Sequence, residues 1–510
     1  MNLDCHILHM ARLVLETRTP LSIATGQGEG VFDTGLVRDA NGLPAIPGSS
    51  LAGVLRRLCL DAAVARTESE KDAQAMVNQL FGNAKQGAED KTEEQASRLH
   101  VSWGCIHDST GDPVEGLLLG DEGEERLADA LLQDACREQP IVRNHVRLDH
   151  RGTAHDTGQF DRTSLRAGHR FSVELSLWGK QTDWDERSKE SPQWRALLSL
   201  LYRRDFRLGG ATRRGLGAMR VVSLHHRILD LADPDDYKIF CQLPSTLCKT
   251  EKEAEFFEPF RPTEDPTDED KGQNLVTATV RLTPDDLYRF GQGNENFLTE
   301  GDAPVHLLPV GERVVEWDES GVGKISDDRR LLIPGSAIKG ALRHRVGYYH
   351  RLLTGTQVLE PEQDTAPDDA PSDDAELALF GYARDDRADE GGEIGHIILD
   401  DLLLIRKKKE NFLHLTHNGI DRFTGGVRDG CLYTEELAFS GPVIEFPLAI
   451  AGANAKALIR RPIRRALALA LQDLVEGRLA LGAGAARGHG YFSGEVTWDD
   501  GGHWIRGGGI

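Results

Sequence analysis

Three short motifs in this chain combine residue types that suit contact with a phosphate group. The first is a Pro-Gly-Ser-Ser turn at residues 47–50, followed by apolar residues at helical spacing. The start of a helix presents free backbone N–H groups and a partial positive charge, which favour a phosphate. A Pro-Gly-Ser turn recurs at residues 334–336, and cationic side chains follow both turns within two helical turns. We interpret both as nucleic-acid backbone sites, with the alternative that their serines only cap the helices. The candidate contacts are Ser49, Ser50, Arg56, Ser336, Lys339 and Arg343.

The second motif is a glycine-rich segment at residues 208–217 and 481–490, in which an arginine directly precedes a Gly-x-Gly. Glycine permits positive φ angles and close backbone approach, although tight turns also use Gly-x-Gly. Neither segment is a dinucleotide fingerprint, because each lies late in its half of the chain and leads into a strand-like run. We interpret both as phosphate contacts, through Arg213, Arg214 and Arg487.

The third motif pairs an aspartate with an arginine ahead of a turn. It reads Asp-Arg-Phe-Thr-Gly at residues 421–425, and a related run begins at Asp149. Arg151 and Arg422 are therefore further candidates for nucleic-acid contact. A hairpin whose aspartate caps its own turn, with the arginine facing water, explains the motif equally well.

These motifs occur twice in the same order, so the chain is a tandem duplication. The spacing agrees: 65 positions separate Asp149 from Arg214, and 66 separate Asp421 from Arg487. We predict a first domain over residues 1–248 and a second over 274–510, with insertions near 305–331 and 356–378. Residues 249–273 are acidic and contain prolines, which predicts a linker.

Each copy is predicted to position its motifs on strands and a few helices. Apolar and β-branched runs favour an opening strand, a helix after the Pro-Gly-Ser turn, and later strands around the remaining motifs. Strands mixed with one or two helices per copy indicate an α+β fold. The expected strands cover residues 7–16, 171–177, 219–224, 275–282, 443–450 and 491–498.

Composition bounds the function. The 510 residues carry a formal charge of −22, so any polyanion must meet a local basic patch on an acidic protein. The seven cysteines are scattered without a Cys-x-x-Cys pair, which argues against a disulfide framework or a zinc site. Without a signal peptide or a membrane-spanning run, the expected location is the cytoplasm, with no membrane partner.

The combined motifs resemble the RAMP superfamily, and in particular the backbone subunits of type III CRISPR effector complexes of the Csm and Cmr kinds. Residues 28–39 followed by 43–50 look like the family's N-terminal segment, in which an aspartate-containing loop precedes the Pro-Gly-Ser-Ser helix. The hairpin and the glycine-rich loop also match, so the resemblance covers nearly all of both halves. A fusion of two such subunits looks like the type III-D arrangement.

The resemblance implies an RRM-like, ferredoxin-related core in each half that binds CRISPR RNA and holds a complementary target RNA. It also implies partnership with other type III effector subunits, and cleavage of the target at a loop aspartate with Mg²⁺ or Mn²⁺ that is not tightly bound. By position, Asp33 takes the catalytic and metal-binding role in the first half. Asp302 is the second choice, because residues 301–304 resemble the family's Asp-x-Pro stretch, although Asp318 lies closer to the following turn.

One acidic residue per site is chemically sufficient, because RNA supplies its own nucleophile in the 2′-OH and Mg²⁺ needs only one or two carboxylates. Two alternatives remain open: a non-catalytic RNA-binding scaffold, and a guide-processing endonuclease with His6, His9 or His145 as its base. In each case we expect the arginines of both halves to line one shared RNA track while the acidic residues gather elsewhere.

Overall fold

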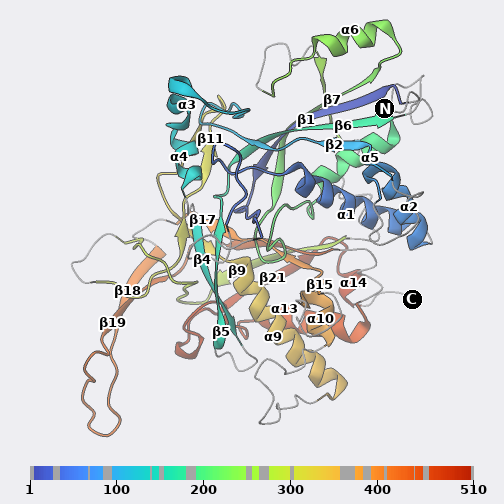
Figure 1. The fold of residues 1–510 in the computed structure, drawn as a ribbon. Helices are drawn as coiled ribbons and strands as arrows, with labels where there is room; N and C mark the ends of the chain where they lie inside the picture. The colour runs from blue at the N-terminus through green and yellow to red at the C-terminus, as the bar shows by residue number, and fades with distance from the viewer. Residues whose placement is uncertain are drawn as a thin grey trace. The chain divides into compact units, whose positions relative to one another are not determined.

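The computed structural model of the chain is drawn in Figure 1. It describes residues 5–26, 35–66, 69–83, 95–137, 141–148, 154–179, 191–247, 256–262, 275–298, 304–356, 374–382, 392–406, 411–441, 443–451 and 459–506. The chain divides into two compact units. The first comprises Met1–Thr212, Leu216–Asn274 and Val314–Ser326, and the second comprises Arg213–Gly215, Leu275–Arg313 and Asp327–Ile510.

The first unit is built on an antiparallel sheet with strand order β2-β6-β1-β7-β8, in which β3 also pairs with β6. Its apolar side chains form one core with those of α1 and α5, in which Leu13, Leu55 and Trp194 are buried. The strands are β1 (Ile7–Thr17), β2 (Leu99–Val101), β3 (Cys105–Ile106), β6 (Arg170–Gly179), β7 (Met219–Asp230) and β8 (Glu258–Pro259). The helices are α1 (Gly48–Arg66), α2 (Glu70–Phe81) and α5 (Pro192–Ser199).

The second unit repeats this plan with the strand order β16-β20-β9-β21, again antiparallel. Its core joins the sheet to α9 and α13, and Val280, Leu342 and Leu467 are completely buried. The strands are β9 (Leu275–Pro284), β16 (Ile397–Leu399), β20 (Ile444–Ala451) and β21 (Phe492–Trp498). The helices are α9 (Gly335–Thr354), α10 (Asp374–Phe380) and α13 (Arg461–Val475).

The two units share one topology. In both, the first strand lies between the third and the fourth, and the second strand pairs with the third. A helix follows the first strand and another follows the third, which gives the βαββαβ order of ferredoxin-like folds. The prediction of two tandem α+β domains is confirmed, and each predicted strand and turn-initiated helix is present.

Smaller elements extend each unit. The first carries α3 (Gly120–Leu127), α4 (Ala130–Cys136), the hairpin β4 (Ile141–Leu148) with β5 (Ala154–Ser164), η3 (Leu200–Tyr202) and α6 (Pro234–Gln242). The second carries β10 (Gly311–Glu312), β13 (Arg330–Ile333) and β17 (Leu402–Leu404) in one small sheet, and β14 (Gly381–Tyr382) with β15 (Glu393–Ile394). It also has the hairpin β18 (Phe412–His417) with β19 (Tyr433–Ala438), η6 (Ala485–Arg487) and α14 (His503–Arg506).

One hairpin belongs to the opposite unit from the chain that surrounds it. The strands β11 (Val315–Trp317) and β12 (Gly323–Ile325) lie within the predicted insertion 305–331 of the second half, yet they are part of the first unit. In the predicted linker, the described residues 256–262 include β8, which pairs with β7, and the buried side chain of Phe260. The rest of that linker and most of the predicted insertion 356–378 lie outside the described residues.

Candidate nucleic-acid interface

Each Pro-Gly-Ser turn brings the start of a helix against a strand. A Cβ atom on Gly48 would collide with the carbonyl oxygen of Val101, and one on Gly335 would lie 2.8 Å from that of Leu399. Only glycine allows this approach, so the motif has a packing role in both units. The amide of Gly335 donates to Asp401 Oδ1 at 2.8 Å. A buried carboxylate of the same chain therefore already accepts from the start of α9.

The serines of these turns are differently placed. Ser49 is exposed, whereas Ser50 and Ser336 are half-buried. The amide of Ser50 donates to the carbonyl of Pro47 at 2.9 Å, so the turn is closed by its own backbone. Ser49 is the serine that remains open to a ligand on the surface of the first unit.

The arginines that follow the turns fasten the first helix of each unit to the second. Arg56 donates to Gly82 O at 3.0 Å and to Asn78 Oδ1 at 2.7 Å, at the end of α2. Its counterpart Arg343 donates to Glu376 Oε2 on α10 at 2.9 Å. Both side chains thus make equivalent contacts within their own units, which is a structural role that the motif did not reveal.

Lys339 is buried on α9 in a positively charged environment. Its ammonium donates to Ile397 O at 3.4 Å and lies 5.8 Å from the centre of the Phe380 ring. Burial, together with the nearby charges of Arg214, Arg213 and Arg343, lowers the pKa of Lys339 to about 7. The short segment Arg213–Gly215 belongs to the second unit, where Arg213 is half-buried and Arg214 is exposed.

The two glycine-rich segments are the same loop built twice. Leu208 donates to Gly217 O at 2.9 Å, and Leu481 donates to Gly490 O at 2.8 Å. The amides of these glycines donate in turn to the carbonyls of Pro20 and Leu287, at 2.9 and 2.8 Å. Gly217 has a φ of 73° and Gly490 one of 80°, in the region that favours glycine. The duplicated motif therefore encodes one backbone geometry.

In the second unit the arginine of this loop binds strand β19 of the β18–β19 hairpin. Arg487 donates to Tyr433 Oη at 2.8 Å and to Glu435 Oε2 at 2.7 Å. Glu435 is completely buried and also accepts from Arg289 at 2.8 Å. Two predicted motifs, the hairpin and the glycine-rich loop, are thus joined through one carboxylate. Arg289 and Glu435 were missed by the sequence analysis, because neither belongs to a motif and their pairing depends on tertiary contact.

The end of the β18–β19 hairpin is an exposed turn with cationic and apolar side chains. Asp421 accepts from the amides of Phe423 and Thr424, at 3.0 and 2.8 Å, and these bonds hold its pKa below the ordinary value. This confirms that the aspartate caps its own turn. Arg422 is exposed beside the ring of Phe423, which is 87% exposed. A cation and a bare aromatic ring on one turn suit a phosphate and a base.

Three predicted residues lie outside the described residues: Asp33, Asp302 and Arg151. The alternative bases lie in different surroundings within the first unit. His6 bonds to Asp230 at 2.7 Å, the buried His9 lies beside Trp194, and His145 stacks on Phe160.

Over the described ranges, no group of three or more His, Cys, Asp or Glu side chains is arranged to hold a metal ion. A Mg²⁺ ion bound through one carboxylate and the RNA itself needs no such group. Among the helices in the described ranges, none has the length and apolar content that crossing a membrane requires.

Sequence comparison agrees with the duplicated architecture. The sequence model of the RAMP superfamily matches the chain twice, over residues 14–220 and 321–493. These segments contain both glycine-rich loops and both hairpins described above. No curated protein sequence matches the chain significantly. RAMP proteins bind RNA and work in multi-subunit CRISPR complexes. The repeated βαββαβ fold, its duplicated glycine-rich loop and the two matched segments together show that this chain belongs to the RAMP superfamily.

Proposed function

We propose that this chain is a backbone subunit of a type III CRISPR effector complex, which binds CRISPR RNA and cleaves complementary target RNA. The observation that carries the proposal is the duplicated RAMP fold with an arginine-bearing glycine loop in each copy. Two fused RNA-binding folds suit a polymer that extends past more than one binding site. A guide and its target form such a polymer.

The described residues support RNA binding of two kinds. The exposed Arg422 and Phe423 offer a cation and an aromatic ring at the end of a hairpin, which suit the backbone and the bases of RNA. Ser49 and Arg214 are exposed polar groups on the helix start and the glycine-rich loop, where a phosphate can approach. Because the net charge of −22 repels RNA overall, binding must come from such local groups.

The proposed cleavage step needs little from the protein. The 2′-OH of the target nucleotide loses its proton and attacks the adjacent phosphate in line. The bond from phosphorus to the 5′-oxygen of the next nucleotide breaks, that oxygen takes up a proton, and a 2′,3′-cyclic phosphate remains. The protein must hold the target nucleotide splayed for the attack. We assign Asp33 in the first half, and Asp302 in the second, to orient the reacting phosphate. Asp33 would also hold Mg²⁺ or Mn²⁺, which would neutralise charge on the phosphate oxygens. The same binding groups without these aspartates would make a scaffold that holds RNA and does not cut it.

The test is metal-dependent cleavage by the complex purified from its host with its own guide RNA. A complementary RNA is incubated with Mg²⁺, with Mn²⁺ or with EDTA, using the wild-type chain and the variants Asp33→Ala and Asp302→Ala. Loss of one metal-dependent cut in Asp33→Ala, with guide and target binding retained, supports catalysis at Asp33. Because general acid–base and metal-positioning groups contribute large factors, we expect a fall of about 100-fold or more.

The matched control is Asp235→Ala, which removes an exposed aspartate on α6. It should cut at the wild-type rate. If Asp33→Ala and Asp302→Ala both cut normally, neither aspartate is catalytic. If the wild-type complex binds its target and never cuts it, the chain is an RNA-binding scaffold.

A further inference from the structure

The first unit contains a surface that is filled by the β11–β12 hairpin. The amide of Val315 donates to Ala167 O at 2.9 Å, and the indole N–H of Trp317 donates to Gly168 O at 2.7 Å. On the other side, the amide of Gly323 donates to Ser109 O at 2.8 Å. The hairpin is therefore held through backbone groups on two neighbouring segments of the first unit.

Side chains complete this seat. The guanidinium of Arg170 lies 4.2 Å from the centre of the Trp317 ring, and His107 meets the same ring edge-on at 6.3 Å. As a result His107 is only 2% exposed and Ala167 only 3%. We call this surface the filled seat; its residues are His107, Ser109, Ala167, Gly168 and Arg170.

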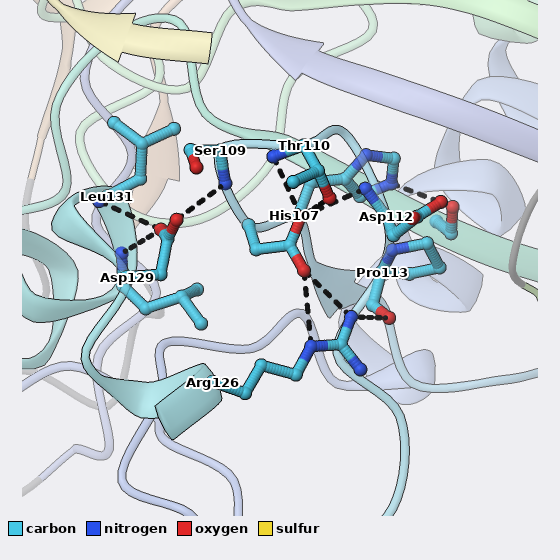
Figure 2. Close-up of polar contacts among 11 residues, drawn as sticks. His107, Ser109, Thr110, Asp112, Pro113, Arg126, Asp129 and Leu131 are labelled. Carbon is cyan, nitrogen blue, oxygen red and sulfur yellow. Dashed lines mark hydrogen bonds and ion pairs between the residues drawn. The ribbon is translucent and has the colours of Figure 1, made fainter. Parts of the chain in front are cut away.

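Hydrogen bonds and an ion pair hold the loop that carries part of the filled seat, and Figure 2 draws these contacts. Asp108 accepts from the amides of Thr110 and Asp112, at 3.0 and 3.1 Å, and from Arg126 at 2.9 Å. Asp129 accepts from the amide of Ser109 at 3.2 Å while it caps α4. Contacts outside the hairpin therefore also position the backbone at Ser109.

The second unit has a corresponding surface at the equivalent positions of its fold, with different side chains. Pro20 and Leu287 are equivalent, because each accepts from the last glycine of its glycine-rich loop. Five positions before them lie Leu15 and Leu282, which are therefore equivalent too. Leu15 pairs with Phe171, and Leu282 pairs with Ile444. It follows that Ala167, Gly168 and Arg170 correspond to Ser440, Gly441 and Val443. Gly168 and Gly441 have positive φ angles of 96° and 106°.

The residues on the other side of the seat can be matched between the two units through the backbone pairing of Ile46 and Ile333. Ile46 bridges Gly104 in the first unit, and the equivalent Ile333 pairs with Leu402 in the second. Counting forward from Gly104 and Leu402, His107 corresponds to Ile405, and the next pair is Asp108 with Arg406. We call Ile405, Arg406, Ser440, Gly441 and Val443 the open seat.

The open seat is uncovered where the filled seat is buried. Ile405 is 70% exposed and Val443 is 53% exposed. Arg406, by contrast, is only 8% exposed, and its guanidinium donates to Tyr288 Oη at 3.2 Å. Its Nε and Nη1 atoms have no hydrogen-bond partner within the described ranges. A buried cation with unused donors is costly unless an acceptor, best an anion, meets it.

Among the residues that the structure describes, no second hairpin is inserted before a first helix. In the second unit, residues 311–331 separate the equivalents of Val37 and Ala45, and the β11–β12 hairpin lies within them. In the first unit the corresponding residues 38–44 form a tight turn, in which Asp39 donates to Leu43 O at 2.8 Å. The hairpin is thus an insertion of the second half, and the filled seat already binds it.

We propose that the open seat receives a β-hairpin from another RAMP subunit, inserted before that subunit's first helix as β11–β12 is inserted before α9. Its apolar side chain covers Ile405 and Val443, and its carboxylate meets Arg406. The proposal rests on the proposed function only in placing the chain in a multi-subunit complex.

A protein fits this surface better than RNA. In the filled seat the contacts at Ala167, Gly168 and Ser109 are all carbonyl oxygens that accept N–H groups. A peptide supplies such donors, whereas a phosphate has only acceptors and would be repelled. The exposed apolar side chains of Ile405 and Val443 also gain from a protein partner, because their burial removes apolar surface from water.

The first experiment is site-specific photo-crosslinking in the complex assembled in its host. A photoreactive phenylalanine analogue replaces Ile405, and the crosslinked peptides are identified by mass spectrometry. We expect a crosslink to the segment that precedes the first helix of another RAMP subunit. The same analogue at Tyr237, an exposed residue of α6, should not label that segment. A crosslink from residue 405 to RNA, only to this chain, or to nothing would overturn the proposal.

The second experiment tests the charge at the seat. Arg406→Glu, and separately Ile405→Asp, should lower retention of the neighbouring subunit in the purified complex at least tenfold, measured by native mass spectrometry. Ile405 is exposed, so its variant remains informative if Arg406→Glu fails to fold. Changing the partner's crosslinked carboxylate to lysine should restore binding to Arg406→Glu. Arg461→Glu, at the exposed start of α13, is the control and should retain the subunit.

Guide RNA content is measured on the same samples. Loss of the neighbouring subunit with guide RNA retained supports the hairpin seat. Full retention of that subunit in both seat variants rejects it, whatever the cleavage activity. Failure of the chain to bind any guide RNA would instead count against the proposed function.

Discussion

The glycine-rich loops of the two units have the same backbone hydrogen bonds but different charged side chains beside them. In the second unit the buried Glu435 accepts from both Arg289 and Arg487. In the first unit the position of Glu435 in the hairpin is taken by Arg162, which lies against Gly210 of the loop, and that of Arg289 is taken by Ser22. The loop of the second unit thus contacts a buried carboxylate, whereas the loop of the first unit has an arginine at the same position of the hairpin.

The difference between the loops shows which residues can differ between the two copies and which are retained. Paired side chains differ between the units, as the ion pair of Arg343 with Glu376 and the neutral contacts of Arg56 do. The glycines at the turns are retained in both. One pair of hydrogen-bonded side chains can be replaced by another pair that satisfies the same polar groups. A glycine at these turns cannot be replaced in this way, because the Cβ atom of any other residue would collide with the neighbouring backbone. Substituting the paired side chains and the turn glycines in both units therefore tests whether the glycines matter more for stability than the pairs.

The largest effect is expected for Gly217→Ala and Gly490→Ala. In each, a Cβ atom would collide with the carbonyl of Leu208 or Leu481 at a positive φ angle. We expect each variant to lose more than about 4 kcal/mol in the free energy of unfolding. Hydrogen exchange of β1 and β9 would report which unit is destabilised.

The matched control is Gly488→Ala. Gly488 has a φ of 85° and nothing within 4 Å of its added Cβ, so it should lose only about 1 kcal/mol. Equal losses in Gly217→Ala and Gly488→Ala would mean that the close approach in the first unit is wrong.

The second effect is a pH dependence confined to the first unit. His169 is completely buried, and burial lowers its pKa to about 4. Above pH 6.5 the imidazole is neutral in both folded and unfolded chains. As the pH falls from 6.5 to 4 the unfolded chain takes up the proton first, so the first unit should lose up to about 3 kcal/mol of stability.

Urea unfolding followed across this pH range, with hydrogen exchange to separate the units, checks the effect. The variant His169→Met should flatten the pH dependence of the first unit. The equivalent residue of the second unit is Pro442, which does not titrate, so that unit lacks this contribution. An unchanged slope in His169→Met would assign the acid sensitivity to other groups.

The third effect compares the arginines that join the first two helices. Among the described residues, Arg343→Ala leaves the buried Glu376 with Arg351 as its ion-pair partner, at 3.5 Å, and should cost about 2–3 kcal/mol. Arg56→Ala removes hydrogen bonds to a carbonyl and an amide oxygen and should cost about 1–2 kcal/mol. Denaturant unfolding would measure both. A larger loss from Arg56→Ala would show that pairing at Glu376 does not set the difference.

The smallest effect on stability is expected for Arg214→Ala. Arg214 is exposed, so its removal should change the free energy of unfolding by less than about 0.5 kcal/mol. Arg487→Ala should cost more, because it removes a partner of Glu435. For guide RNA binding we expect the reverse order, since Arg487 is already bonded within its chain.

Binding of the guide RNA as a function of salt concentration measures this last comparison. Arg214→Ala should lower the salt slope by about one if its side chain neutralises a phosphate. Arg487→Lys is the informative second variant, since it keeps the charge and loses the two-sided bonding to Tyr433 and Glu435. A larger loss of RNA affinity in Arg487→Lys than in Arg214→Ala would contradict the proposed difference between the loops.

The sequence by itself determined the duplication, the α+β class and the positions of the main strands and helices. These depend on local properties: apolar periodicity, the rigid Pro-Gly turn, and glycines at fixed intervals. The cap formed by Asp421 was among the alternatives that its motif allowed, and the exposed arginine beside it followed from the same turn.

Only the tertiary structure decided which cations are already bonded within the chain. Arg56, Arg343 and Arg487 look alike in the motifs, but their partners Asn78, Glu376 and Glu435 come from other elements. The same holds for the β11–β12 hairpin, whose sequence lies in the second half and whose hydrogen bonds are made in the first unit. Pairing between distant residues depends on how the elements pack, so local sequence patterns do not predict it.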